Sequence, residues 1–293
     1  MKVTGIGGGH GLAQTLKAAR RYADDVQAVV TVADDGGSSG RLSRELGIPP
    51  PGDIRNCLVA LSETDRLSEL YQHRFASGPL TGHTVGNLLI AALTEVTGDF
   101  AGAVDEAGRL LATRGRVHPA TTELVSLRAR VAGGVVKGQV AVAQSEGLIQ
   151  AVYLKPPEPA ANPGAVEAIM SADQVVLGPG SLFTSLIATL LVPGVRKALQ
   201  ETDACRVFVC NARMQKGETQ GLDAVAHLHA LFAHAGPYCV DAVVVQAPEL
   251  EADAVAVDRD ALEFLGPRVV AADVASSTGH DPSKLAEVLA DIS

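Results

Sequence analysis

The sequence predicts an α/β fold of three layers, α/β/α, in which helices cover both faces of a mainly parallel sheet. The main observation is that short β-branched runs alternate with helical patterns, which is typical of such sheets. The runs lie near residues 2–6, 27–32, 174–177, 206–210, 241–246 and 268–271.

The middle of the chain has a different pattern, which is the second observation. From Leu124 to Leu154 it is typical of consecutive strands, with a hairpin-like break at Gly133-Gly134 and another at Ser145-Glu146-Gly147. We therefore expect a single domain over residues 1–293 that carries a small β-rich insertion or cap over residues 115–155.

A glycine-rich turn follows the first predicted strand. Gly7-Gly8-Gly9-His10-Gly11 leads from this strand into an amphipathic helix. Such a turn presents backbone N–H groups and the positive end of a helix dipole, which suit a phosphate. The strict pattern G-x-G-x-x-G is absent, because its last place holds His10 when counted from Gly5 and Leu12 when counted from Gly7. An NAD-dependent oxidoreductase is thereby disfavoured, although Asp34 stands where a ribose-binding acid belongs.

The segment Ala33–Leu42 follows the second predicted strand and carries the strongest functional pattern of the chain. Glycines let the backbone approach a ligand, and a guanidinium fits a phosphate. Two adjacent carboxylates can hold a ribose or a cation. The alternative is a polar loop with an Asp-Gly turn. The candidate residues are Asp34, Asp35, Gly36, Gly37, Ser38, Ser39 and Arg41.

A proline-rich loop, Pro49–Asp53, precedes the next apolar helix. Asp53 suits the N-cap of that helix, which explains it without any function. Arg55 and Asn56 in the first turn favour a ligand site instead. Both interpretations stay open at this stage.

The segment Gly82–Asn87 opens another apolar helix. His83 and Asn87 are candidate ligand contacts, and Gly86 permits close approach of a backbone or a ligand. The alternative is that His83 marks the helix start and that Asn87 is a hydrogen-bonding residue of the core.

A further strand–loop–helix unit spans residues 177–185. It brings Gly178, Gly180, Ser181 and Thr184 to the start of a helix, where a phosphate can bind; the alternative is a tight turn with helix caps. Asn211 directly follows the strand near 206–210. Ligands of parallel sheets bind outside the carboxyl ends of the strands, and all these motifs lie at that edge. Their convergence predicts a binding site there.

Composition excludes several classes of function. A formal charge of −9 argues against general affinity for nucleic acid or an anionic membrane. The longest apolar runs are too short to insert into a bilayer, and the first residues do not resemble a secretory signal. Four cysteines contain no C-x-x-C pair, which favours buried thiols over a zinc or redox site. We expect a cytoplasmic protein.

The motifs ADDGGSSGRL, PPPGDIRNCLVAL, QHRF, GHTVGNLLIAAL, LGPGSLFTS, LLVPG and GET, in this order, resemble the YvcK family of gluconeogenesis factors. This family belongs to a superfamily with CofD, the 2-phospho-L-lactate transferase of deazaflavin cofactor synthesis. The resemblance extends from about Val3 to Lys284, which is nearly the whole chain.

The resemblance implies a Rossmann-like fold and a nucleotide-linked ligand. For the YvcK branch it implies binding of UDP-sugars such as UDP-N-acetylglucosamine, no required cofactor, no established catalysis, and a role in cell shape and wall homeostasis during gluconeogenic growth. For the CofD branch it implies transfer of a phosphoester unit to a deazaflavin hydroxyl with Mg²⁺. In that case Asp34, Asp35 and Asp53 are the catalytic candidates. A homo-oligomer is also expected.

The loop GGSSGRL and the segment PPPGDIRN favour the YvcK branch. Three places depart from the usual pattern of that family: His10 replaces a common threonine, Ala188-Thr189 replaces Pro-Asn, and Ala212-Arg213 follows Asn211. Arg213 can add a phosphate contact or alter the sugar preference, so the nucleotide and the sugar are the least defined parts of the prediction.

Overall fold

The computed structural model describes residues 1–145 and 147–292. Its main sheet has seven strands, and each pairs in parallel with its neighbours. In spatial order they are β10 (Arg268–Ala272), β9 (Ala242–Gln246), β8 (Cys205–Val209), β7 (Gln174–Leu177), β1 (Lys2–Gly7), β2 (Asp25–Val30) and β3 (Arg116–Pro119). A strand lies at or within a residue or two of each of the six predicted runs.

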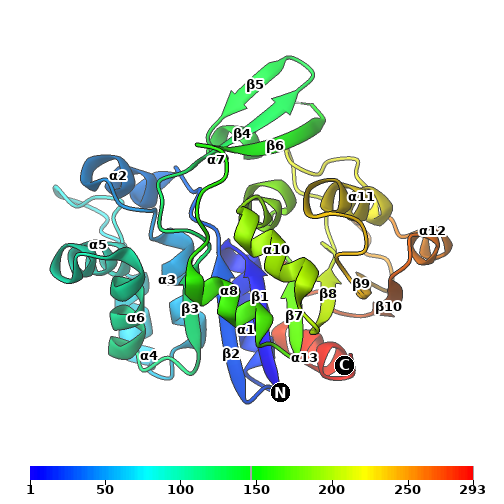
Figure 1. The fold of residues 1–293 in the computed structure, drawn as a ribbon, viewed down its shortest axis with the longest axis horizontal. Helices are drawn as coiled ribbons and strands as arrows, with labels where there is room; N and C mark the ends of the chain where they lie inside the picture. The colour runs from blue at the N-terminus through cyan, green and yellow to red at the C-terminus, as the bar shows by residue number, and fades with distance from the viewer. Residues whose placement is uncertain (146, 293) are drawn as a thin grey trace.

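Two layers of helices complete the fold and confirm the predicted α/β/α arrangement (Figure 1). One face of the sheet packs against α1 (Gly9–Ala19), α3 (Gly52–Leu61), α6 (Phe100–Leu110) and α13 (Pro282–Ala290). The other face packs against α8 (Pro163–Met170), η1 (Leu182–Ile187), α9 (Ala188–Leu190), α10 (Pro193–Glu201), α11 (Ala224–Ala235) and α12 (Arg259–Phe264). The central strands are buried on both faces, which explains their continuous apolar sequences.

Three further helices lie near the β2 and β3 side of the sheet: α2 (Gly37–Leu46), α4 (Asp65–Gln72) and α5 (Val85–Thr97). Helix α2 begins inside the glycine-rich segment, so Ser38 and Ser39 belong to its first turn and not to a loop. Helix α5 begins at Val85, capped by the Thr84 hydroxyl, which accepts the Asn87 amide at 3.4 Å.

The β-rich middle segment divides between two sheets. Strand β3 lies within the predicted 115–155 insertion, yet it pairs with β2 at the edge of the main sheet. The separate sheet contains β4 (Ser126–Val131), β5 (Gly134–Lys137) and β6 (Ile149–Lys155), in the order β5-β4-β6. It lies beyond the carboxyl ends of the main strands, at the top of Figure 1.

One part of the predicted run of consecutive strands is wrong. A short helix, α7 (Gln139–Ala143), lies between β5 and β6, because Gly138 turns the chain with a φ of +95°. Gly133-Gly134 does form the predicted hairpin break between β4 and β5. Of the second predicted break, Glu146 lies outside the described residues.

The order of the strands reverses between β1 and β7. From β1 the chain continues to β2 and β3 on one side, and β7, β8, β9 and β10 follow on the other. Ligands of open α/β sheets bind in the crevice at such a switch point.

Within the described residues, no single helix has the length and apolar composition needed to cross a membrane. The four cysteines, Cys57, Cys205, Cys210 and Cys239, form no disulfide, and three of them are buried.

Candidate ligand-binding site

The two glycine loops at the switch point touch each other. Gly7–Gly11 follows β1 and Gly178–Ser181 follows β7, and the two strands are paired with Ile6 opposite Leu177. A Cβ atom on Gly11 would lie 2.2 Å from the Pro179 carbonyl oxygen and 2.6 Å from Gly180 Cα. Only glycine permits this approach, so the sequence at Gly11 is dictated by the contact between the loops.

A cavity of about 270 Å³ lies directly over these loops. It brings together many of the site residues that were predicted from distant motifs. Three further side chains, Gln139, Ser185 and Gln215, complete the lining. Its lining residues are Gly8, Gly9, His10, Gly11, Asp53, Gln139, Gly180, Ser181, Ser185 and Gln215.

A larger cavity of about 560 Å³ adjoins the first and shares four of its lining residues. It extends toward the segments that follow β8 and β10, and Asn211 and Arg213, one of the residues that depart from the family pattern, line it after β8. The lining residues are His10, Gly11, Gln14, Gly180, Asn211, Ala212, Arg213, Met214, Gln215, Ser276, Thr278, Gly279 and His280.

The start of helix α1 supplies the phosphate-binding geometry expected of the first loop. Its N-cap is Gly8, which has no side chain to satisfy the first amides of the helix. Gly9 adopts a left-handed φ of +61°, and both glycines line the smaller cavity. Backbone amides at a helix start attract an anion.

Asp53 is not the N-cap of α3, so the capping interpretation is wrong. Pro51 holds that position, and Asp53 lies in the first turn of the helix. Its Oδ2 atom is buried without a hydrogen-bond partner beside Gly8, where an added Cβ would be 2.6 Å away. Burial, with the charge of Asp34 adding to it, raises the pKa of Asp53 to about 7. A half-protonated carboxyl therefore borders the smaller cavity at neutral pH.

Asp34 and Asp35 flank this cavity without lining it. The Asp34 carboxylate accepts the Gly36 amide at 2.8 Å, and burial raises its pKa. The Asp35 carboxylate accepts the Val140 amide of α7 at 3.0 Å. Asp34 belongs to the acidic side of the site, whereas Asp35 attaches the small sheet to the main body.

A second group of predicted residues forms a buried polar network between α2, α3 and α5. Ser38 Oγ lies 3.0 Å from His83 Nδ1 and accepts Asn87 Nδ2 at 3.1 Å. Arg55 donates to the Asn87 side chain at 3.1 Å and to the Asn56 side chain at 2.7 Å. This placement matches the alternative in which Asn87 is a hydrogen-bonding residue of the core. The network fixes α3, and with it Asp53.

Two more predicted residues also have partners in the protein. Ser39 Oγ accepts the Gly52 amide at 2.9 Å at the start of α3. The Arg41 guanidinium donates to the Thr81 carbonyl at 2.8 Å and lines neither cavity. The sequence predicts a phosphate contact for Arg41, whereas this geometry favours a role outside the cavities.

A buried carboxylate already occupies the helix start after β7. Glu218 accepts the amides of Phe183 and Thr184 at 2.6 and 2.8 Å, and it accepts the Thr184 hydroxyl at 3.0 Å. Because these amides already bind Glu218, we expect an anionic ligand to bind at the start of α1, where the first amides have no side-chain cap. Gly178 shapes the same turn, and Asn211 Oδ1 accepts the Gly180 amide at 3.1 Å.

Sequence reasoning missed several cavity residues. Gln14, Gln139 and Gln215 are common residue types in ordinary positions and carry no sequence signal. Ser276, Thr278 and His280 come from a loop after β10, far along the chain. The only available signal was the resemblance, which extends over this loop to the His280-Asp-Pro-Ser-Lys284 motif.

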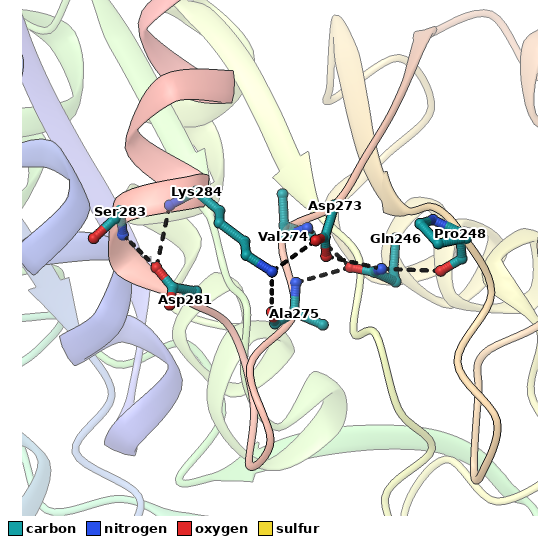
Figure 2. A network of polar contacts seen from close by, with 8 residues as sticks. All are labelled: Gln246, Pro248, Asp273, Val274, Ala275, Asp281, Ser283 and Lys284. Carbon is teal, nitrogen blue, oxygen red and sulfur yellow. Dashed lines mark hydrogen bonds and ion pairs between the residues drawn. The ribbon is translucent and has the colours of Figure 1, made fainter.

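That loop is held in place by a polar network, shown in Figure 2. Gln246, at the end of β9, accepts the amides of Val274 and Ala275 at 2.9 and 2.8 Å. Its amide group donates to the Pro248 carbonyl at 2.9 Å and to Asp273 at 3.2 Å. Lys284 Nζ binds Asp273 Oδ2 at 2.6 Å and the Ala275 carbonyl at 3.1 Å.

The described residues contain no group of three or more His, Cys, Asp or Glu side chains arranged to hold a metal ion. The pair Asp34 and Asp53 remains compatible with Mg²⁺, because this ion is commonly held by one or two carboxylates together with ligand phosphates. The unpartnered Oδ2 of Asp53 is a suitable donor atom.

Comparisons with known proteins agree with this architecture. The family model of the 2-phospho-L-lactate transferase CofD matches residues 3–275. The gluconeogenesis factor of Bacillus subtilis is 40% identical over 99% of this chain and 98% of its own length. That of Halalkalibacterium halodurans is 42% identical over 89% of this chain and 85% of its own length.

A solved structure matches as well. A crystal structure of a UPF0052 family member from Bacillus halodurans superimposes with a TM-score of 0.94. The two chains are 40% identical, and the match covers 98% of each. The chain therefore belongs to the CofD-like family and, within it, to the gluconeogenesis factors of the YvcK type.

Proposed function

We propose that this protein binds a nucleotide-linked sugar, such as UDP-N-acetylglucosamine, at the switch point of its sheet. The observation that carries the proposal is the meeting of two glycine loops beneath two adjoining cavities. The uncapped start of α1 suits the diphosphate. Asp34 and Asp53 lie toward β2, where carboxylates of related folds bind a ribose diol.

We propose that binding regulates other proteins in the cytoplasm in support of cell shape and wall homeostasis, as the family resemblance implies. Arg41 and the network of Ser38, Asn56, His83 and Asn87 support the site from outside the cavities. A homo-oligomer stays part of the proposal, and light scattering on the purified protein measures it.

A thermal-shift experiment tests the ligand. UDP-N-acetylglucosamine, UDP, GDP and NAD are compared, each over a concentration series with and without Mg²⁺. A ligand at about 100 times its Kd stabilises the folded state by roughly 2.7 kcal/mol, which raises the melting temperature of a chain of this size by several degrees. We expect this rise with the uridine nucleotides. A rise with NAD and none with any uridine nucleotide would contradict the proposal.

One observation favours a second function, a CofD-like transfer of a phosphoester unit to a deazaflavin hydroxyl. A carboxyl with a pKa of about 7 at the cavity wall is suited to accept the proton of an attacking hydroxyl. Mg²⁺ held by Asp34 and the phosphates of the donor would neutralise phosphate charge, and Asp53 would stay free to accept the proton. Mass spectrometry of the protein with Mg²⁺, the deazaflavin and the activated phospholactate donor tests it. Product that disappears in Asp53→Asn would establish this second function over the first.

A further inference from the structure

We propose that the larger cavity is the subsite for the sugar of the ligand and that His280 presents a fixed hydrogen-bond acceptor to a sugar hydroxyl. The inference rests on the proposed function, because it takes the ligand to be a nucleotide-linked sugar. It assigns one end of that ligand to a particular set of side chains.

The chemistry of the lining is the first argument. The polar side chains of the larger cavity, other than its two histidines and one arginine, are neutral amides and hydroxyls: Gln14, Asn211, Gln215, Ser276 and Thr278. Its one guanidinium, on Arg213, donates through Nη1 to the Ala252 carbonyl at 2.7 Å, while its Nε atom is buried without a partner. The lining contains neither a carboxylate nor a lysine. Neutral donors and acceptors match the hydroxyl groups of a sugar.

The order of groups along the sheet is the second argument. A nucleotide-linked sugar carries its nucleoside and its sugar on opposite ends of the diphosphate. The diphosphate fits over the start of α1, at the junction of the two cavities. The acidic pair Asp34 and Asp53 marks the β2 side for the ribose, so the larger cavity on the β8 side is left for the sugar.

The protein fixes the tautomer of His280. The ring is buried, 9% exposed, and its Nε2 lies 3.2 Å from the Cys210 carbonyl oxygen, which can only accept. Nε2 therefore carries the proton, and the neutral ring keeps Nδ1 as an acceptor. Burial lowers the pKa of His280 to about 4, so this form persists at neutral pH. Among the described residues Nδ1 has no partner.

The network of Figure 2 makes this acceptor rigid. Gln246 uses both its carbonyl and its amide group to hold residues 273–275, and Lys284 holds the same stretch from α13. The Asp281 amide donates to the Val274 carbonyl at 2.9 Å, which closes the loop that carries His280. A preorganised wall binds a ligand without a further ordering cost.

The experiment measures Kd by titration calorimetry for two probes, UDP and UDP-N-acetylglucosamine. His280→Gln keeps a donor near the position of Nε2 and removes the acceptor at Nδ1. Gln14→Leu removes a second polar group from the lining of the cavity, and Gln14 is only half-buried on α1, so this variant carries the test if His280→Gln lowers the melting temperature. His229→Gln, on the exposed face of α11, is the matched control.

We expect wild-type protein to bind the sugar nucleotide more tightly than UDP. Both cavity variants should weaken UDP-N-acetylglucosamine by about two- to tenfold and leave UDP within about twofold, the effect of one neutral hydrogen bond. The control should change neither Kd.

Other outcomes overturn the inference in distinguishable ways. Equal weakening of both probes would assign the cavity to the nucleoside or the diphosphate. An unchanged Kd for both would remove these side chains from the site. Equal affinity of wild-type protein for UDP and the sugar nucleotide would refute the sugar subsite alone. Absence of any uridine nucleotide binding would refute the proposed function as well.

Discussion

At the residue scale, Asp53 sets the electrostatics of the site. Its Oδ2 atom lies beside Gly8 and is buried without a hydrogen-bond partner. Burial away from water therefore raises the free energy of the ionised carboxylate, which hydration would otherwise stabilise. A ligand amide, hydroxyl or cation that reaches Oδ2 would relieve this cost. The ligand-free protein is therefore less stable than the same protein with such a partner bound at Oδ2.

Asp53→Asn should change the pH dependence of stability. The folded-state pKa of about 7 exceeds the ordinary aspartate pKa of 3.8, so between these values the native protein retains a proton that the unfolded chain has released. Wild-type stability therefore falls as pH rises from about 4 to about 7, on the order of 1.4 kcal/mol for each unit at most. The variant cannot ionise and lacks this loss.

Melting temperatures of both proteins from pH 4 to pH 8, without ligand, measure it. The melting temperature of the variant relative to that of the wild type should increase as pH rises, and this increase should level off above pH 7. A difference that stays constant over the whole range would show that Asp53 is not buried in its ionised form.

Arg41 offers a second test at this scale. Because its guanidinium is bound to the Thr81 carbonyl and lines neither cavity, we expect Arg41→Ala to change the Kd of UDP-N-acetylglucosamine by less than about twofold. Titration calorimetry, with circular dichroism as the folding control, measures this. A loss of tenfold or more, only partly recovered by Arg41→Lys, would instead support the phosphate contact that its sequence position suggests.

The glycines of the site could be predicted from the sequence, because their role depends on local backbone geometry. Gln14, Gln215 and Ser276 could not, since an amide or a hydroxyl acquires its role only from neighbours that the fold brings near. Asp53 is an intermediate case. The sequence predicted that it belongs to the site or to the helix start, but only the structure shows that its Oδ2 is buried and unpartnered and that it is not the N-cap.

At the element scale, the contact between α1 and the loop after β7 joins the two halves of the sheet. Thr15 of α1 donates to the Gly178 carbonyl at 2.7 Å, one turn beyond the close approach at Gly11. The helix that presents its first amides to the cavity is thus positioned by the second glycine loop. The phosphate-binding surface depends on both loops together.

Gly11→Ala should destabilise the protein, although Ala favours helices over Gly by about 1 kcal/mol. The new methyl group would lie 2.2 Å from the Pro179 carbonyl oxygen, so the loops must separate at a cost of about 1–3 kcal/mol or more. Urea unfolding measures this. Gly133→Ala is the control, because an added Cβ there meets nothing within 4 Å. A Gly11 variant as stable as the wild type would mean that the loops do not touch.

Elements with strong local signals were predicted, and two further differences between sequence pattern and structure have clear causes. Strand β3 has only four residues, ends at Pro119 and lacks a run of β-branched residues, so it gives almost no pattern. The helix start after β7 has the sequence of a phosphate site, but Glu218 reaches it from 34 or 35 positions away. Tertiary contacts of this kind leave no local trace.

At the scale of the whole molecule, the small sheet is attached over the carboxyl edge of the main sheet (Figure 1). Besides the Asp35 contact with Val140, Gln139 donates to the Thr184 carbonyl at 3.2 Å. Helix α7 therefore bridges the segment after β2 and the segment after β7, and Gln139 lines the smaller cavity. The small sheet is thus joined to the site through α7, and Gln139 of that helix forms part of the cavity wall.

Asp35→Ala should loosen this attachment. Loss of the carboxylate removes the partner of the Val140 amide, which water then solvates because the bond is exposed, so we expect a net cost of about 0.5–1.5 kcal/mol. Hydrogen exchange followed by mass spectrometry should show faster exchange in peptides from α7 and β4 to β6, while β1, β7 and β8 keep their protection. Glu45→Ala, on the exposed side of α2, should change neither region. Faster exchange throughout the main sheet would indicate a global loss of stability instead.

The position of β1 in the middle of the sheet also has a consequence for how the chain is made. Val3 of β1 pairs with Val26 of β2 on one side and with Gln174 of β7 on the other. During translation β7 is therefore synthesised long after β2. Until then a nascent chain exposes one unpaired edge of a strand that is almost wholly buried in the folded protein, and such an edge is prone to mispairing. Because His280 must also emerge before the larger cavity closes, binding competence arises only near the end of synthesis. A chaperone that shields the β1 edge during that interval should raise the yield of folded protein.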